Sequence, residues 1–319
     1  MKKKVLVTYK IPTCGFDTLR DEFDVIFPED DKISDLEVDR HIETAEAIVS
    51  VFGHKLSNGD ISRAAKLKLI ANFGVGYDNI DIPFVTGKGI TVTNTPDPVT
   101  EPTAELAMGL MIAVARKIGC LNNRLRTREG VSVGVMKNLG TTLTGKTLGI
   151  IGMGSIGQAV ARRALAFGMN IIYHNRTRLS TEIENRYSAG MVSLEEVLRT
   201  SDVVSLHTPL TPETKHLVGE AEFKIMKRSA YIINTARGSV INENELIAAL
   251  QNKEIAGAGL DVFENEPNIP KELLAFDNVV ATPHVGTATL ETREEMSIVV
   301  SDIIRKFFQG ELTKFMVNR

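Results

Sequence analysis

KTLGIIGMGSIGQAVARRALAFGMNIIYHN, at residues 146–175, is the stretch that decides the fold. Residues 148–151 form a short apolar run, which is typical of a buried parallel strand. The pattern G-x-G-x-x-G follows at residues 152–157, and a helical segment occupies residues 156–167. A second apolar run at residues 171–173 completes a strand, turn, helix and strand within about 30 residues, which is the sequence context of a dinucleotide-binding unit.

The three glycines of this pattern have separate physical tasks. Gly152 permits a tight turn, Gly154 the close approach of backbone to a pyrophosphate, and Gly157 the close packing of helix on strand. The helix, which Gly168 is placed to end, offers free N–H groups and a partial positive charge at its N-terminus. A glycine pattern without such neighbours is more often a plain turn, so the flanking strands and helix support the prediction.

Length and composition indicate a globular protein of two domains, since the chain has 319 residues. A net charge of −3 gives no electrostatic reason to expect nucleic acid or membrane as a partner. No apolar run approaches the roughly 18 residues of a membrane-spanning helix, and the run after Lys4 is too short for a signal peptide. The two cysteines, Cys14 and Cys120, have no disulfide or metal spacing, so we expect a cytoplasmic protein without a metal site.

Apolar runs alternate with helical segments in the first 94 residues, which predicts a parallel sheet covered by helices. The expected strands are residues 5–9, 24–27, 47–51, 69–72 and 90–93, and the expected helices include 35–42 and 61–66. A glycine-rich turn, NFGVGYD, follows at residues 72–78. Its backbone N–H groups can hold a carboxylate; the alternative is a turn that simply needs glycine for positive φ.

Two prolines at residues 94–99 interrupt this alternation, and a long helix with Thr100 as its expected N-cap follows. We infer a domain crossover near residues 95–101. After the dinucleotide unit, further strands are expected at residues 203–206, 230–234, 258–262 and 279–282. Asn242 with Glu245 resembles a capping box. A last apolar helix, residues 288–309, is closed by Gly310 and is expected to pack against the first domain.

The residue eighteen positions after Gly157 bears on the choice between the two nicotinamide cofactors. NAD sites usually place a carboxylate there, whereas this chain has Asn175, followed by Arg176 and Arg178. Guanidinium groups pair with a 2′-phosphate that a carboxylate would repel, so we expect NADP to be preferred over NAD. The alternative is two arginines solvated on a loop, which leaves the preference mixed.

Three strand ends beyond the dinucleotide turn carry reactive side chains, namely Arg237, Glu266 and His284. Ligands of open α/β sheets bind outside the carboxyl ends of the strands, so one cleft can receive all three. Each alone has a structural alternative: a surface charge, a solvated loop acid, or a hydrogen-bonded core histidine. Their occurrence at consecutive strand ends beside a nicotinamide-sized cofactor favours a catalytic site.

These motifs together resemble the D-isomer-specific 2-hydroxyacid dehydrogenases over nearly the whole chain. They occur in the family's order: NFGVGYDNID at 72–81, TAEL at 103–106, the glycine pattern at 152–157, NTARG at 234–238, GLDVFENEP at 259–267 and PHVG at 283–286. Within the family the chain looks closest to the group of glyoxylate/hydroxypyruvate reductases and 2-ketogluconate reductases.

The resemblance implies two doubly wound parallel-sheet α/β domains. A flavodoxin-like substrate domain would comprise residues 1–99 plus 286–319, and a Rossmann cofactor domain residues 100–285. It also implies a homodimer formed through the long helix and the arm after it, about residues 100–143. Many relatives have Trp in that arm, whereas this chain has none, so a more open or differently lined substrate pocket is expected.

The resemblance further implies an oxidoreductase that moves a hydride from NAD(P)H to the carbonyl carbon of a small 2-keto acid. His284 would be the general acid, Glu266 would orient and charge it, and Arg237 would bind the substrate carboxylate together with the N–H groups of Val75 and Gly76. The positions that match cofactor contacts are Thr103, Gly152, Gly154, Ser155, Ile156, Gly157, Asn175, Arg176, Arg178, His207, Thr208, Thr235, Ala236, Asp261 and Gly286.

Two alternatives stay open at this point. One is another activity of the same fold, of which phosphoglycerate dehydrogenase is an example; its longer members add a domain after the last helix. The other is an NAD(P)-sensing binding protein or corepressor that keeps the same three side chains. Turnover of the cofactor distinguishes an enzyme from a sensor.

Overall fold

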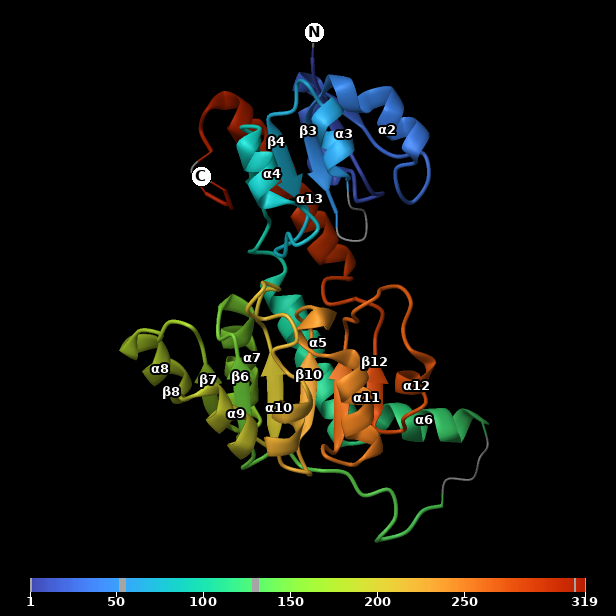
Figure 1. Ribbon diagram of the computed structural model, residues 1–319, viewed down its shortest axis with the longest axis vertical. Helices are drawn as coiled ribbons and strands as arrows, with labels where there is room; N and C mark the ends of the chain where they lie inside the picture. Colours follow the sequence, from blue (N-terminus) through green and yellow to red (C-terminus); the bar gives the residue numbers. More distant parts are fainter. Residues whose placement is uncertain (1, 52–55, 128–131, 313, 319) are drawn as a thin grey trace. The chain divides into compact units, whose positions relative to one another are not determined.

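The computed structural model describes residues 2–51, 56–127, 132–312 and 314–318. The chain divides into two compact units, Met1–Val99 with Thr287–Arg319, and Thr100–Gly286. Each unit has its own parallel sheet (Figure 1). No helix in the part of the chain that the structure describes is both long and apolar enough to cross a membrane.

The first unit has a five-stranded sheet in the order β2-β1-β3-β4-β5, with every pair parallel. This is the flavodoxin-like strand order that the resemblance predicted, and it puts the switch in strand order between β1 and β3. The strands are β1 (Lys3–Val7), β2 (Phe23–Ile26), β3 (Ala45–Ser50), β4 (Leu69–Asn72) and β5 (Thr91–Thr93).

Alternate residues of these strands face two separate apolar layers, because side chains of a strand alternate between its faces. Val5 and Val7 pack with α13 (Leu290–Gln309), whereas Leu6 packs in the other cluster, with α2 (Asp35–His41) and α3 (Asn58–Arg63). The helices are η1 (Cys14–Phe16), α1 (Leu19–Glu22), α2 (Asp35–His41), η2 (Ile42–Thr44), α3 (Asn58–Arg63), α4 (Ile82–Gly87) and α13 (Leu290–Gln309).

Helix α13, red in Figure 1, belongs to this first unit and packs on its sheet, as the apolar stripe predicted. Met296, Val300 and Ile304 are buried against β1, β3 and β4. The helix begins one residue after its N-cap Thr289 and ends at Gly310, which has φ +77°. A Cβ added at Gly15 would lie 2.2 Å from the carbonyl oxygen of Ser297, so only glycine permits this close contact of η1 with α13.

The second unit has a seven-stranded parallel sheet in the order β12-β11-β10-β9-β6-β7-β8. Read from β6, this is the Rossmann order, so the predicted fold class is confirmed for both sheets. The strands are β6 (Thr147–Ile151), β7 (Asn170–His174), β8 (Ala189–Met191), β9 (Val203–Leu206), β10 (Tyr231–Asn234), β11 (Gly257–Leu260) and β12 (Val279–Ala281).

Helices cover both faces of this sheet (Figure 1). One apolar layer contains α5 and α7, and the other contains α9, α10 and α11. The helices are α5 (Thr100–Ala115), α6 (Ile118–Thr127), α7 (Ser155–Ala166), α8 (Thr181–Tyr187), α9 (Leu194–Thr200), α10 (Glu220–Ile225), η3 (Gly238–Val240), α11 (Glu243–Gln251) and α12 (Lys271–Leu274).

Local details differ from the sequence-based expectations at a few places. Helix α5 begins at Thr100 itself, so Thr100 is not the N-cap that we expected. Asn242 caps α11 by accepting from the N–H of Glu245, but the Glu245 carboxylate turns to the N–H of Glu220 instead of completing a capping box. Gly286 lies in the second unit, one residue beyond the predicted boundary, and its N–H donates to Asp261.

Candidate active site

The turn after β6 has the geometry of a phosphate-binding loop. Gly152 has φ +93°, and a Cβ there would lie 2.8 Å from the backbone of His207, after β9. A Cβ at Gly157 would lie 2.6 Å from the carbonyl oxygen of Gly152, so the helix can only approach the turn because both residues are glycine. A Cβ at Gly154, by contrast, would meet no atom of the described residues within 4 Å, so the backbone borders open space there.

Helix α7 starts at this open space, with Gly154 as its N-cap. The first N–H groups of a helix have no acceptor inside the helix, and here they belong to Ser155, Ile156 and Gly157. Asn175, after β7, accepts a hydrogen bond from the N–H of Met153 at 2.6 Å and so ties the turn to the neighbouring strand. The arrangement can bind the phosphates of a dinucleotide.

Two buried hydroxyl groups lie near the phosphate-binding loop, at the carboxyl ends of neighbouring strands. The hydroxyl oxygens of Thr208, after β9, and Thr235, after β10, are buried and have no hydrogen-bond partner in the described ranges. Buried polar groups are normally paired, so these two fit a bound molecule that supplies the partners. Burial lowers the pKa of His207 to about 4, and its Nε2 lies 2.8 Å from the hydroxyl of Ser205. The residues present therefore fit a dinucleotide cofactor beside a neutral imidazole.

The two arginines after β7 have different surroundings. Arg178 forms two hydrogen bonds of 3.0 Å with the carboxylate of Glu184, which also accepts from the hydroxyl of Tyr173. Arg176 is exposed. The pKa of Glu213 is lowered mainly by hydrogen bonds from Thr211 and its own backbone, and further by the charge of Arg176. Arg178 therefore already has a carboxylate partner, and only Arg176 stays as a candidate for the 2′-phosphate.

His284 and Glu266 form a direct pair after β12 and β11. Nδ1 of His284 donates to Oε2 of Glu266 at 2.8 Å, and the other carboxylate oxygen accepts from the N–H of Phe263 at 2.9 Å. Burial of Glu266 opposes its ionisation, but the hydrogen bond and charge of His284 outweigh it, so the pKa of Glu266 is lowered. A carboxylate held in this way fixes the orientation of the imidazole ring.

Asp261 shapes the loop that carries His284. Its side chain is 1% exposed and accepts hydrogen bonds from the hydroxyl of Thr282 and the N–H groups of Val285 and Gly286. Burial raises the pKa of Asp261, although these hydrogen bonds favour the ionised form. His284 has φ +53°, and its N–H donates to the carbonyl oxygen of Asp261. Asp261 thus stabilises an unusual backbone conformation at the histidine.

Arg237 joins this pair from the end of β10. Its Nη1 donates to the carbonyl oxygen of Ala236 at 2.7 Å, and its charge contributes to the lowered pKa of Glu266. A Cβ at Gly238 would lie 1.9 Å from the backbone of Phe263, so glycine lets the two strand-end loops touch. The structure therefore brings Arg237, Glu266 and His284 together within the second unit.

The turn after β4 directs two N–H groups outward. Asn72 donates from its side chain to the carbonyl oxygens of Gly74 and Gly76, and Asn94 donates to that of Val75. In a trans peptide the N–H points opposite to the C=O, so the N–H groups of Val75 and Gly76 face away from these asparagines. Neither N–H has an acceptor among the residues that the structure describes. The sequence pattern did not single out Asn94; its position after β5, the neighbour of β4, is the signal that could have found it.

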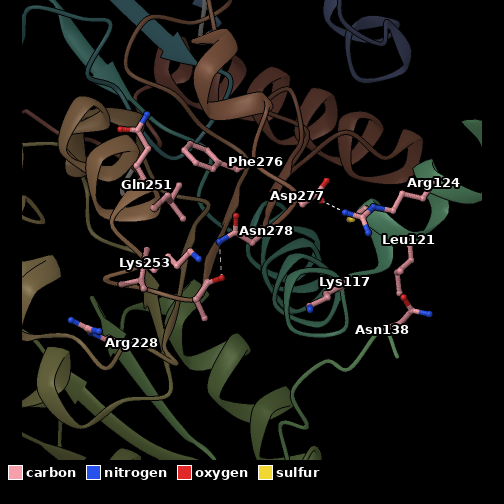
Figure 2. A pocket seen from close by; sticks show the side chains of 14 residues that line it. Lys117, Leu121, Arg124, Asn138, Arg228, Gln251, Lys253, Phe276, Asp277 and Asn278 are labelled. Atoms are coloured by element: carbon pink, nitrogen blue, oxygen red, sulfur yellow. Dashed lines mark hydrogen bonds and ion pairs between the residues drawn. The ribbon is translucent and has the colours of Figure 1, made fainter. Parts of the chain in front are cut away.

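A second cavity lies at the amino ends of the strands of the second sheet, opposite the phosphate-binding loop (Figure 2). This cavity of about 660 Å³ lies before β10, β11 and β12, and Arg124 and Asp277 form an ion pair beside it. Lys117, Arg228 and Lys253 line it, and they follow the C-termini of α5, α10 and α11. Helix C-termini carry partial negative charge, which these cations offset. It lies away from the carboxyl ends of the strands, where such sheets bind ligands.

Comparison with known proteins agrees with this geometry. The family model for the NAD-binding domain of D-isomer specific 2-hydroxyacid dehydrogenases matches residues 108–286. A glyoxylate reductase of Pyrococcus horikoshii is 44% identical, and the match covers 100% of this chain and 97% of the relative. The crystal structure of a glyoxylate reductase from Paecilomyes thermophila has 36% identity and a TM-score of 0.90, with 99% of this chain and 98% of that chain covered.

A second solved structure carries a bound cofactor. It is an NADPH-dependent glyoxylate/hydroxypyruvate reductase from Sinorhizobium meliloti in complex with NADP and malonate. This structure has 34% identity to the chain and a TM-score of 0.88, with 99% of this chain and 97% of that chain covered.

The fold and these side chains define an NAD(P)-dependent oxidoreductase that acts on small 2-keto or 2-hydroxy acids. The chain belongs to the D-isomer-specific 2-hydroxyacid dehydrogenase family.

Proposed function

We propose that the protein is an NADPH-preferring reductase of a small 2-keto acid, of the glyoxylate, hydroxypyruvate or 2-ketogluconate type. The observation that carries this proposal is the His284–Glu266 pair, 2.8 Å apart, with the carboxylate anchored on the N–H of Phe263. The relatives named glyoxylate reductase support the substrate class.

In this proposal His284 gives a proton to the carbonyl oxygen of the substrate. When bound, the cofactor supplies the hydride that reaches the carbonyl carbon. Glu266 holds Nδ1 of the ring, so Nε2 is the nitrogen that carries the transferable proton. Asp261 keeps the histidine loop in place through the N–H groups of Val285 and Gly286, which makes it a positioning residue.

Arg237 binds the substrate carboxylate and stabilises the negative charge that develops on the carbonyl oxygen. The outward N–H groups of Val75 and Gly76 bind the same carboxylate. The proposal makes residues 1–99 with the C-terminal helix the substrate domain and residues 100–286 the cofactor domain.

The cofactor contacts proposed here follow from the edge of the second sheet. The N-terminus of α7 binds the pyrophosphate, and the hydroxyls of Thr208 and Thr235 donate to the cofactor. Arg176 binds the 2′-phosphate, since Asn175 leaves no carboxylate to repel it. Arg178 is excluded from this role because Glu184 already holds it.

We further propose a homodimer formed through the long helix α5 and the segment after it, about residues 100–143, which includes α6. The described part of this region exposes large apolar side chains: Val133 is 101% exposed, Val135 92% and Met136 77%. Several large apolar side chains exposed within four residues of sequence favour a protein–protein interface at this segment. Light scattering at micromolar protein should give twice the monomer mass, and Val135→Asp with Met136→Asp should shift it to the monomer. A monomeric wild-type protein would contradict the proposal.

A cytoplasmic location is part of the proposal. The two cysteines, Cys14 and Cys120, are free thiols in the structure, which is the usual state in a reducing compartment. Fractionation of cells that express the protein should recover it with cytoplasmic markers, and recovery from a membrane or extracellular fraction would contradict this.

The experiment that tests the function is oxidation of NADPH, with NADH in parallel, against glyoxylate, hydroxypyruvate, pyruvate and 2-ketogluconate. We expect loss of NADPH absorbance with at least one of them and slower loss with NADH. Binding of NADPH without oxidation by any of the four would favour the sensor alternative.

A further inference from the structure

A cavity of about 440 Å³ opens at the carboxyl edge of the first unit's sheet. Its walls come from residues 9–12 after β1, from Val51 after β3, from Phe73 after β4 and from the first turn of α13. Strands β1 and β3 are the neighbours at which the strand order switches. Open α/β sheets bind their ligands at that position, so the cavity lies where a ligand is expected.

The walls are mostly apolar, but two cations line the cavity. Ile11, Val51 and Phe73 supply apolar surface, and Lys10 and Arg293 supply positive charge. The guanidinium carbon of Arg293 lies 6.0 Å from the centre of the Phe73 ring. Burial lowers the pKa of Arg293, yet a guanidinium stays protonated at neutral pH. Its partly desolvated charge interacts more strongly with an anion than a fully hydrated one does.

The start of α13 adds to the same potential. This helix has 20 residues, and Thr289 and Leu290 at its N-terminus line the cavity. The N-terminus of a long helix carries partial positive charge and favours an anion. The helix dipole and the two side-chain charges thus both favour an anion in this cavity.

The cavity is continuous in sequence with the proposed carboxylate-binding turn. Phe73 forms a wall of the cavity, and Val75, two residues further on, offers its N–H to the substrate carboxylate. Consecutive Cα atoms are about 3.8 Å apart, so Phe73 and Val75 lie within roughly 8 Å of each other. Both belong to the first unit. A ligand with a chain of several carbons can therefore contact both at once, whereas glyoxylate, with two carbons, is too short.

We propose that this cavity receives the far end of the substrate and that Arg293, assisted by Lys10, binds a second anionic group there. The proposal rests on the function proposed above and narrows it to 2-keto acids that carry a distal carboxylate or phosphate. Glyoxylate is then a minimal substrate that leaves the cavity empty.

The first test uses two pairs of substrates, of which the first is matched in length. 2-Ketoglutarate and its neutral amide, 2-ketoglutaramate, differ only in distal charge, and phosphohydroxypyruvate with hydroxypyruvate provides a phosphate arm. We expect kcat/KM to favour the charged member of one pair by about tenfold or more, the usual scale of a hydrogen bond to a charged group. The pair that shows the preference tells whether the cavity binds a distal carboxylate or a distal phosphate. A ratio near one in both pairs would overturn the proposal.

The second test changes the cations. Arg293→Leu should reduce the charged-to-neutral ratio towards one, Arg293→Lys should retain part of it, and Lys10→Met should reduce it less. Arg305→Leu is the matched control, because Arg305 lies on the same helix, is not part of the cavity lining and pairs with Glu22. The fall in kcat/KM for glyoxylate should be much smaller than the fall for the charged substrate. An unchanged ratio in Arg293→Leu would refute the assignment.

Two further outcomes are separable. If Arg293→Leu does not fold, the wild-type ratio and Lys10→Met decide, since Lys10 is exposed. If neither NADPH nor NADH is oxidised with glyoxylate or with any longer 2-keto acid, the proposed function fails and this inference fails with it. Oxidation with glyoxylate but no charge preference removes the inference alone.

Discussion

Two glycine turns in this molecule present backbone N–H groups by different means. Both follow a parallel strand, and both begin with a glycine of positive φ, Gly152 after β6 and Gly74 after β4. After Gly152, helix α7 starts three residues on and its N-terminus directs the N–H groups. After Gly74 no helix follows until α4, and the side chains of Asn72 and Asn94 orient the peptides by binding their carbonyl oxygens.

The difference explains why the first turn gives a strong signal in the sequence and the second only a weak one. A helix N-terminus is a local feature, so strand, glycines and helix appear together within one segment. The asparagine arrangement is non-local, because Asn94 follows a different strand, β5. The same physical result, outward backbone N–H groups after a parallel strand, therefore leaves a strong pattern in one case and a weak one in the other.

Among the changes that bear on this comparison, the largest effect is expected from breaking the first turn. Gly152→Ala places a Cβ 2.8 Å from the backbone of His207 at φ +93°, which strains the turn by up to about 3 kcal/mol. We expect NADPH affinity to fall by about 100-fold in calorimetric titration. Gly190→Ala in β8 is the control, since a Cβ there meets no described atom within 4 Å. Unchanged affinity in Gly152→Ala would contradict the cofactor role of this turn.

The next prediction concerns binding of the 2′-phosphate of NADPH. Arg176→Ala should raise KM for NADPH by about tenfold and leave KM for NADH nearly constant, because only NADPH carries the 2′-phosphate. Arg186→Ala, on α8 and paired with Glu182, is the control. Equal effects on both cofactors would mean that the phosphate is not bound there, and a larger effect of Arg178→Ala would exchange the roles of the two arginines.

A smaller effect is expected from the second turn. Asn94→Ala removes the donor that orients the peptide between Val75 and Gly76 and should cost about 1 kcal/mol of substrate binding. KM for the 2-keto acid should rise about fivefold, with KM for NADPH unchanged. Asn318→Ala, which removes another asparagine clamp of the same unit, on β5, is the matched control. An equal rise in that variant would assign the effect to general loosening of the unit.

The smallest effect lies outside both turns and concerns stability. The folded-state pKa of Glu266 is lowered, so its ionised form stabilises the protein above its unfolded-state pKa of about 4.3. This contribution is lost as pH falls through the folded-state pKa. Denaturant titrations between pH 5 and pH 3 should therefore show a steeper decline in the free energy of unfolding for wild type than for Glu266→Gln. Parallel curves would exclude the linkage.

The sequence-based expectations were accurate where an element has a clear local pattern, and they missed elements that lack one. β4 and β9 occur at the expected bounds because their apolar runs are flanked by polar and turn residues. α8, β8 and α9 were not expected, since segments of 7, 3 and 7 residues are too short to show a period. Arg176 and Arg178 are the same residue type two positions apart, and only the fold shows that Glu184 holds the second.

The same holds for the candidate site, where the reactive residues were predicted and their supporting contacts were not. Strand ends and residue types placed Arg237, Glu266 and His284 at one edge of the sheet, and the structure has the carboxylate and the ring in contact. The supporting contacts of Asp261 were beyond prediction, because they join β11 to a loop after β12 through backbone N–H groups. The roles of these side chains in the reaction stay predictions.

The measurement that tests the central claim most directly is the kinetics of His284→Ala. With saturating NADPH and glyoxylate, we predict that kcat falls by about 10² to 10⁴, the usual contribution of a general acid, while the dissociation constant for NADPH changes by no more than about twofold. A kcat within about tenfold of the wild-type value would contradict the assignment of His284 as the proton donor and with it the proposed reaction geometry.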